Sequence, residues 1–265
     1  MVSMKLLAKT ALALAIAGAS VTTAFATHAW STYHWARTSS SFTLHLLDST
    51  VSNSNAPWPS ELATAASQWS ASTKMDLQVA AYSNTSTSRK RCSAVAGKVR
   101  VCNASYGTNG WLGLASINLD SNGHISQGTA KMNDSYTSSW TDPNESKHVM
   151  CQEIGHTFGL DHQSTDGSSQ GTCMDYSTSP SSTAPNAHDY DELAIIYAHT
   201  DSYNSYSISS PFAVSAAQSG MAGDVPLGVL VHKDHMYETY VAADGKGGLW
   251  INRVTLAPSA MHVKL

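Results

Sequence analysis

Alternating apolar and polar positions predict strands along this chain, and apolar residues that recur every three or four positions predict helices. Strands are expected at residues 41–47 and 77–80, and between them a helix at 61–69 has one apolar stripe. The tract of Ser, Thr and Asn at 83–88 is expected to form a surface loop. This half of the chain therefore mixes strands with a helix.

Two hairpins are predicted further along the chain. Residues 111–118 and 125–132 have strand patterns, and the segment between them contains Asn-Gly, a strong hairpin signal. Residues 237–241 and 249–254 have the same character and flank a Gly-rich turn. The second hairpin belongs to a β-rich C-terminal segment.

The clearest helix start is at Asp142. Its side chain can cap a helix, Pro143 suits the first helical position, and Glu145 stands three residues after the cap. The helix is expected to stop near Gly159, where glycine allows a sharp exit. A last helix is expected at residues 189–198, where one face is apolar.

The first residues have the pattern of a secretory signal peptide. Lys5 and Lys9 give a positive start, residues 11–17 form a short apolar centre, and Ala-Phe-Ala at 24–26 resembles a cleavage site. Residues 1–26 are therefore expected to be removed on export, which makes the mature protein a secreted one.

The composition narrows the possible functions. Hydrophobic residues make up 42%, so a disordered acidic chain is excluded, and charged residues make up only 13%. Soluble domains have about 25% charged residues; here Ser, Thr and Asn supply the polarity, as is common outside the cell. The formal net charge is −4 and no basic run occurs, so nucleic acid is not an expected partner. The one long apolar stretch is N-terminal, so no membrane span is expected in the mature chain.

Four cysteines are expected to form two disulfide bonds. An oxidising compartment favours disulfides, and four cysteines allow three pairings. Close spacing favours Cys92–Cys102, around a segment that could be a hairpin, and Cys151–Cys173. The alternative for the second pair is a thiolate metal site, but the spacing of a zinc knuckle is absent.

The segment 152–162 carries the candidate chemistry. Residues four apart on a helix share a face, so Gln152 and His156 can point at one ion with Glu153 beside them. Gly159 allows the chain to turn, so that His162 can return as a third ligand. A zinc ion held by three protein ligands keeps a position open for water, lowers the pKa of that water to about 7 and polarises a peptide carbonyl. Glu153 would take the proton from that water and pass it to the leaving amine.

This segment resembles the metzincin signature H-E-x-x-H-x-x-G-x-x-H. Glu153, His156, Gly159 and His162 match it, and Gln152 stands where the signature has its first histidine. The resemblance implies a zinc metallopeptidase that cleaves proteins or peptides, with Glu153 as the general base and the other matching side chains around the metal.

Further residues are similar to the matrixin branch of that family. Met174 is similar to the Met-turn that lies under the metal, and Tyr176 is of a type that can stabilise a substrate oxyanion. The resemblance implies an α+β, zincin-like catalytic domain at 27–200 with a twisted mixed sheet, followed by a linker and β-rich segment at 201–265. The strand at 111–118 would be an edge strand that binds an extended substrate.

Gln152 leaves three interpretations open. Its amide oxygen could be a weaker zinc ligand, another histidine could complete the site, or the site could have lost its metal. His148 is a poor replacement, because eight residues of helix separate it from His156 by about 12 Å. In the third case the chain would be a secreted binding protein of the same fold without catalysis.

The sequence thus predicts a secreted zinc-dependent metalloendopeptidase, with the non-catalytic binding protein as the alternative. Zinc is the expected cofactor, held by His156, His162 and Gln152, with Glu153 as the catalytic residue. Calcium is left open: Asp166, Asp175 and Asp189 could bind it, but no D-x-D-x-D-G loop occurs and solvated acids are favoured. The oligomeric state is undetermined, with a monomer favoured. The remaining histidines lack a motif and are assigned no role.

Overall fold

One mixed β-sheet of eight strands runs through the protein, as described by a computed structural model for residues 28–177, 179, 181–207 and 225–261. The predicted signal peptide at 1–26 lies outside these described residues. In chain order the strands are β1 (Phe42–Ser49), β2 (Met75–Ala81), β3 (Val99–Ala104), β4 (Trp111–Leu119), β5 (Ile125–Asn133), β6 (Val229–Lys233), β7 (Tyr237–Ala243) and β8 (Leu249–Leu256). Their order across the sheet is β2-β1-β3-β5-β4-β8-β7-β6. The pairs β1–β2, β1–β3 and β3–β5 are parallel, and the others are antiparallel.

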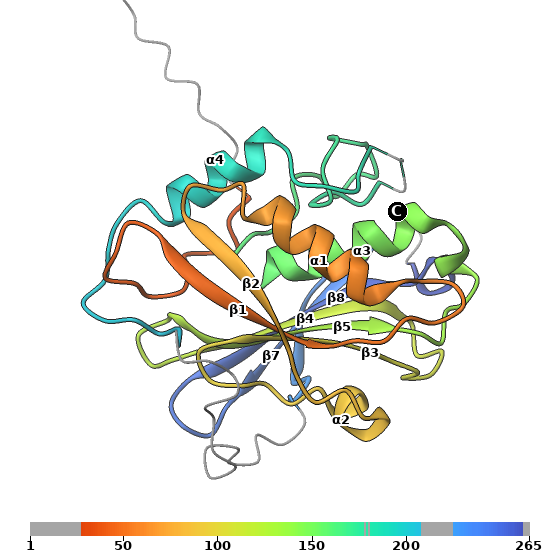
Figure 1. Ribbon diagram of the computed structural model, residues 1–265, viewed down its shortest axis with the longest axis horizontal. Coiled ribbons are helices and arrows are strands. Elements are labelled where there is room, and N and C mark those ends of the chain that lie inside the picture. Colours follow the sequence, from red (N-terminus) through yellow and green to blue (C-terminus); the bar gives the residue numbers. More distant parts are fainter. Residues whose placement is uncertain (1–27, 178, 180, 208–224, 262–265) are drawn as a thin grey trace, which may run out of the picture.

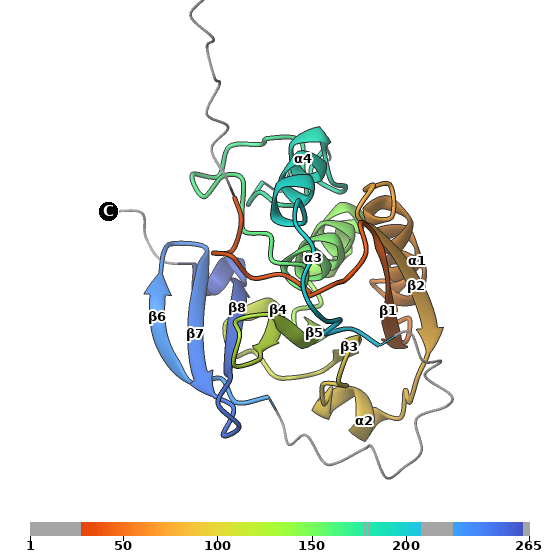
Figure 2. The same cartoon turned by 90° about the vertical axis from the view of Figure 1, so that its left-hand side faces the viewer.

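Helices cover the sheet on both sides, but unequally. They are α1 (Trp58–Trp69), α2 (Ser86–Arg91), α3 (Pro143–His156) and α4 (Ala187–Ile196). Figures 1 and 2 show α1, α3 and α4 on one side of the sheet and the short α2 on the other. The main core lies between the sheet and the three larger helices and contains the fully buried side chains of Trp35, Trp58, Trp69 and Trp140. The α+β class predicted from sequence is confirmed, and none of the described helices is long and apolar enough to cross a bilayer.

Helix α3 begins where the sequence places its cap. The Asp142 carboxylate accepts a hydrogen bond from the backbone N–H of Asn144 at 2.8 Å, and Pro143 occupies the first turn. The helix ends at His156, slightly before the expected stop, and Gly159 follows with a φ of +94°. A Cβ at Gly159 would lie 1.9 Å from the carbonyl oxygen of Tyr33, so only glycine fits this turn.

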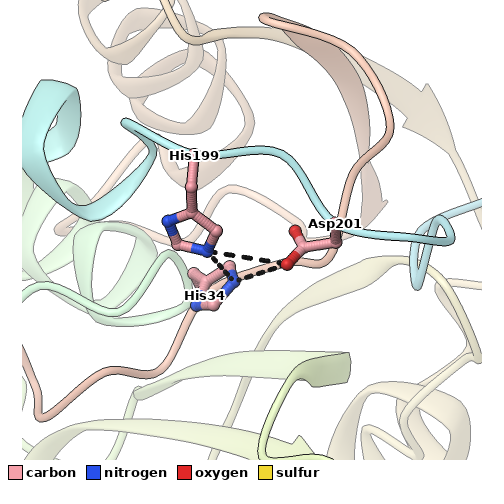
Figure 3. A group of neighbouring side chains, drawn as sticks. All are labelled: His34, His199 and Asp201. Carbon is pink, nitrogen blue, oxygen red and sulfur yellow. Dashed lines mark hydrogen bonds and ion pairs between the residues drawn. The ribbon is translucent and has the colours of Figure 1, made fainter.

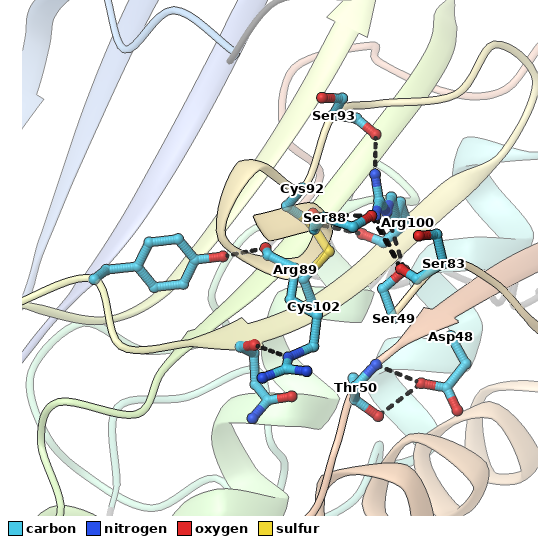
Figure 4. The surroundings of a disulfide bond; sticks show 12 residues. Asp48, Ser49, Thr50, Ser83, Ser88, Arg89, Cys92, Ser93, Arg100 and Cys102 are labelled. Atoms are coloured by element: carbon cyan, nitrogen blue, oxygen red, sulfur yellow. Dashed lines mark hydrogen bonds between the residues drawn. A yellow bond between two sulfur atoms is a disulfide. The ribbon is translucent and has the colours of Figure 1, made fainter. Parts of the chain in front are cut away.

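Strand β3 is the main element that the sequence pattern does not reveal. It is buried along its whole length between β1 and β5, although Arg100 interrupts its apolar run. The Arg100 guanidinium donates hydrogen bonds to the carbonyl oxygens of Ser83 and Ser88, and these bonds offset the free-energy cost of burying its charge. Figure 4 shows this network beside the Cys92–Cys102 disulfide. The disulfide pairing is confirmed, but the segment that it closes contains a parallel strand rather than a hairpin.

The second predicted disulfide, Cys151–Cys173, is also present. It joins α3 to the turn that contains Met174. Because each cysteine neighbours a candidate site residue in sequence, this bond fixes the helix and the turn relative to one another.

The C-terminal strands continue the sheet at β4. Strand β8 pairs antiparallel with β4 from Trp111 to Leu119, and β7 and β6 follow outward. The predicted C-terminal hairpin is confirmed as β7–β8. The prediction that the strand at 111–118 is a free edge is wrong, because β8 forms hydrogen bonds with it along its length.

Candidate active site

Two histidines of the sequence motif converge at the end of α3. His156 is the last residue of the helix, and His162 returns to it after the turn at Gly159. Their Nε2 atoms lie 3.0 Å apart, and both side chains are buried. Two nitrogens on a tetrahedral zinc ion, each about 2.0–2.1 Å from it, are separated by about 3.3 Å. The separation therefore fits two ligands of one ion.

Hydrogen bonds at the outer ring nitrogens orient both imidazoles. Nδ1 of His156 lies 2.9 Å from the carbonyl oxygen of Leu160, which can only accept, so Nδ1 carries the proton and Nε2 is left as a lone pair. Nδ1 of His162 lies 2.9 Å from the Tyr176 hydroxyl and 3.4 Å from an Asp161 carboxylate oxygen. Such partners are typical of metal-binding histidines, because they fix the tautomer and the ring plane.

Burial keeps both rings neutral. Burial and the nearby Arg253 guanidinium together lower the pKa of His162 to about 4, while Asp161 opposes the shift. The pKa of His156 is well below its usual value, mainly because of burial and secondly because of His162. Neutral imidazole is the form that binds a metal ion.

Gln152 lies on the same buried face of α3, and its amide is oriented by the turn after Cys173. Its Nε2 donates to the carbonyl oxygens of Cys173 and Asp175 at 3.1 and 2.9 Å. This fixes which end of the amide is oxygen, and Oε1 lies 3.1 Å from the hydroxyl of Thr255 on β8. The amide oxygen is thus directed away from the turn and toward β8.

No other side chain takes the place of the missing histidine. His148 donates through Nδ1 to the carbonyl oxygen of Ser182, and its Nε2 lies 3.3 Å from the amide nitrogen of Gln152. Across the described part of the chain, no His, Cys, Asp or Glu joins His156 and His162 in a compact group of three ligand atoms. Gln152 is therefore the remaining third-ligand candidate of the motif.

Glu153 lies beside this group, at the interface of α3 with β4. Its Oε1 accepts a hydrogen bond from the Thr255 hydroxyl at 2.6 Å, and the backbone N–H of Ala115 also binds the carboxyl group. Its Oε2 has no hydrogen-bond partner among the described residues. The carboxyl fits only because residue 113 is glycine, since a Cβ there would lie 2.1 Å from Oε1. Burial raises the pKa of Glu153 to about 8, with Thr255 and Arg253 opposing the shift.

The β7–β8 hairpin closes the site. Arg253 of β8 forms an ion pair with Asp161, and its guanidinium lies 4.3 Å from the ring centre of Tyr237 and 5.1 Å from that of Trp30. The Tyr237 ring also lies 5.1 Å from the His162 ring. As a result, Gln152, Glu153 and His156 are 0% exposed and His162 is 7% exposed.

Sequence reasoning missed these covering residues. Trp30, Tyr237, Arg253 and Thr255 lie far from the motif in the chain, and no local pattern marks them. The position of Tyr237, Arg253 and Thr255 over the site depends on the pairing of β8 with β4 and β7, whereas Trp30 reaches the site from the N-terminal segment, where its backbone N–H donates to the carbonyl oxygen of Gly159. No model of a known protein family matches the chain, and no curated protein matches it.

Proposed function

We propose that this protein is a secreted, zinc-dependent metalloendopeptidase whose site is closed in this conformation. The observation that carries the proposal is the pair of Nε2 atoms of His156 and His162, 3.0 Å apart with their outer nitrogens hydrogen-bonded, beside the carboxyl group of Glu153. The two disulfides and the absence of a membrane-spanning helix among the described residues are compatible with export. The assignment of these residues to a metzincin-like site is part of this proposal.

The residues divide the chemistry between them. His156, His162 and the Gln152 oxygen would hold zinc, which when bound activates a water molecule and polarises a peptide carbonyl. Once the site opens to water and Glu153 ionises, its carboxylate accepts a proton at Oε2 and delivers it to the leaving amine. Tyr176, hydrogen-bonded to Nδ1 of His162, holds that ring in the orientation that directs Nε2 at the proposed ion.

The closed form excludes substrate. An extended peptide could pair with β4 only along the edge where β8 now lies. In addition, Oε1 of Glu153 already accepts a hydrogen bond from the Thr255 hydroxyl. Strand β8 therefore has to separate from β4 before a peptide reaches Glu153. We infer latency, with the C-terminal hairpin as the inhibitory segment.

A second function is favoured by one specific observation. The Arg253 guanidinium lies beside His162 and neutralises the charge of the Asp161 carboxylate, so a cation is already present at the edge of the site. In that case the chain would be a non-catalytic secreted binding protein. A digestion assay of zinc-loaded protein, with and without a chelator, separates the two functions. Chelator-sensitive cleavage supports the peptidase. The binding protein is supported if a zinc-loaded variant in which β8 no longer covers the site cleaves nothing.

The substitution Gln152→His is expected to raise zinc affinity at the proposed site by about tenfold or more. The reason is that an imidazole nitrogen is a better zinc ligand than an amide oxygen. Competitive titration of the stripped protein against a chromophoric chelator measures the change. The control is Gln163→His, because Gln163 lies outside this group of side chains and binds Asn186 and Asp189. Equal affinity in wild type and Gln152→His would place residue 152 outside the coordination sphere.

A further inference from the structure

A second group of metal-binding side chains lies outside the candidate active site. It joins His34, from the segment before β1, with His199 and Asp201, which follow α4. Figure 3 shows the three side chains pointing toward one another. One ligand atom from each lies within 4.8 Å of the other two.

The distances fit a single tetrahedral ion. His34 Nε2 lies 3.1 Å from His199 Nε2, and each of these nitrogens lies 3.5 Å from Asp201 Oδ1. Ligands about 2.0–2.2 Å from zinc are separated by about 3.3–3.5 Å in a tetrahedral site. His124, in the turn between β4 and β5, also has its Nε2 3.4 Å from Asp201 Oδ1, but it does not belong to the compact group of three ligand atoms.

Hydrogen bonds fix the tautomers of two of these histidines. Nδ1 of His34 lies 2.7 Å from the carbonyl oxygen of Thr32, so Nδ1 carries the proton. Nδ1 of His124 lies 2.8 Å from the hydroxyl of Tyr203, which donates its own proton to Asp120 and can therefore accept from His124. In the neutral form of each ring, Nε2 therefore has a free lone pair, and this atom faces the carboxylate of Asp201.

When the rings are neutral, a cation between the imidazole lone pairs and the carboxylate oxygen stabilises their arrangement. The Asp201 carboxylate is itself positioned, because its Oδ2 accepts a hydrogen bond from the backbone N–H of Arg37 at 2.9 Å. Outer-nitrogen bonds to a carbonyl and a hydroxyl, and a tethered carboxylate, are the surroundings that metal-binding side chains usually have.

We propose that His34, His199 and Asp201 form a second zinc site. Two histidines and one carboxylate are ligands that zinc prefers, and three protein ligands are enough to hold the ion. The ion would tie the N-terminal segment to the segment after α4. This site does not depend on the proposed peptidase function.

The test is the zinc stoichiometry of stripped protein titrated with zinc alone. The main variant is His199→Ala, because the His199 side chain is 54% exposed and its loss leaves the packing intact. The matched control is His232→Ala, an exposed histidine of β6. We expect His199→Ala to bind one zinc equivalent fewer than wild type, and His232→Ala to bind the same number as wild type.

The difference between variants separates this site from the candidate active site. If both sites bind zinc, wild type takes two equivalents and His199→Ala takes one; if only this site binds, they take one and none. Asp201→Asn, which retains an oxygen for the Arg37 N–H, is expected to weaken zinc binding by about tenfold or more. Zinc should also raise the Tm of wild type more than that of His199→Ala. Equal zinc equivalents in wild type and His199→Ala would overturn the proposal.

Discussion

The substitution Arg253→Glu is expected to raise peptide cleavage by zinc-loaded protein by about tenfold or more. In the closed form Arg253 pairs with Asp161 and is packed between aromatic rings, with its side chain 3% exposed. A glutamate there would face the Asp161 carboxylate instead, so the pairing that holds β8 over the site becomes a repulsion. The population with a free β4 edge rises, and cleavage rises in proportion.

The control for this variant is Val254→Ala. Val254 is the next residue of β8 and points to the opposite face of the sheet, so its truncation weakens the packing of the strand without touching Asp161. Cleavage of a quenched-fluorescence peptide library measures both variants, and circular dichroism checks that each is folded. If a folded, zinc-loaded Arg253→Glu protein cleaves no faster than wild type, β8 is not an inhibitory segment.

The substitution Glu153→Gln, made in the Arg253→Glu chain, is expected to lower the cleavage rate by about 10²–10⁴-fold. Glutamine retains the shape of the side chain and can still accept the hydrogen bond from Thr255, but it cannot take a proton from water. Zinc binding should remain, because Glu153 is not one of the proposed ligands. The loss is therefore expected in kcat rather than in metal content.

Glu145→Gln is the matched control for this second variant. Glu145 lies on the first turn of the same helix, far along α3 from the histidine pair, and its replacement should leave the rate unchanged. Rates are compared at equal zinc occupancy. Retention of full cleavage by the Glu153→Gln chain would remove Glu153 as the general base, and with it the proposed mechanism.

The convergence of the motif residues could be anticipated from sequence because its causes are local. The cap at Asp142, the helical spacing of Gln152 and His156, and the glycine turn at Gly159 each have a short-range signal. The same applies to β4 and β5, whose strands meet at an Asn-Gly turn. The structure places His162 against His156 as the spacing suggested.

The remaining features depend on contacts between distant parts of the chain. Strand β3 can bury a charged residue because the Arg100 guanidinium donates hydrogen bonds to the carbonyl oxygens of Ser83 and Ser88. The cover over the site depends on β8 pairing with β4, more than a hundred residues earlier. No periodicity within a strand specifies which neighbour it pairs with.

The second histidine cluster illustrates the same limit. His34 and His199 are isolated in sequence and were assigned no role, since a single histidine has no spacing to interpret. They meet because the N-terminal segment and the chain after α4 lie side by side, where the Arg37 N–H also binds Asp201. The sequence shows ligand types, but only the fold shows which ones meet.

The proposed function requires that His156 and His162 bind one zinc ion beside Glu153. Anomalous scattering at the zinc edge, from crystals of the full chain saturated with zinc, tests it most directly. We expect a peak about 2.0–2.1 Å from Nε2 of both His156 and His162. Crystals that show no peak between these two nitrogens at saturating zinc would contradict it.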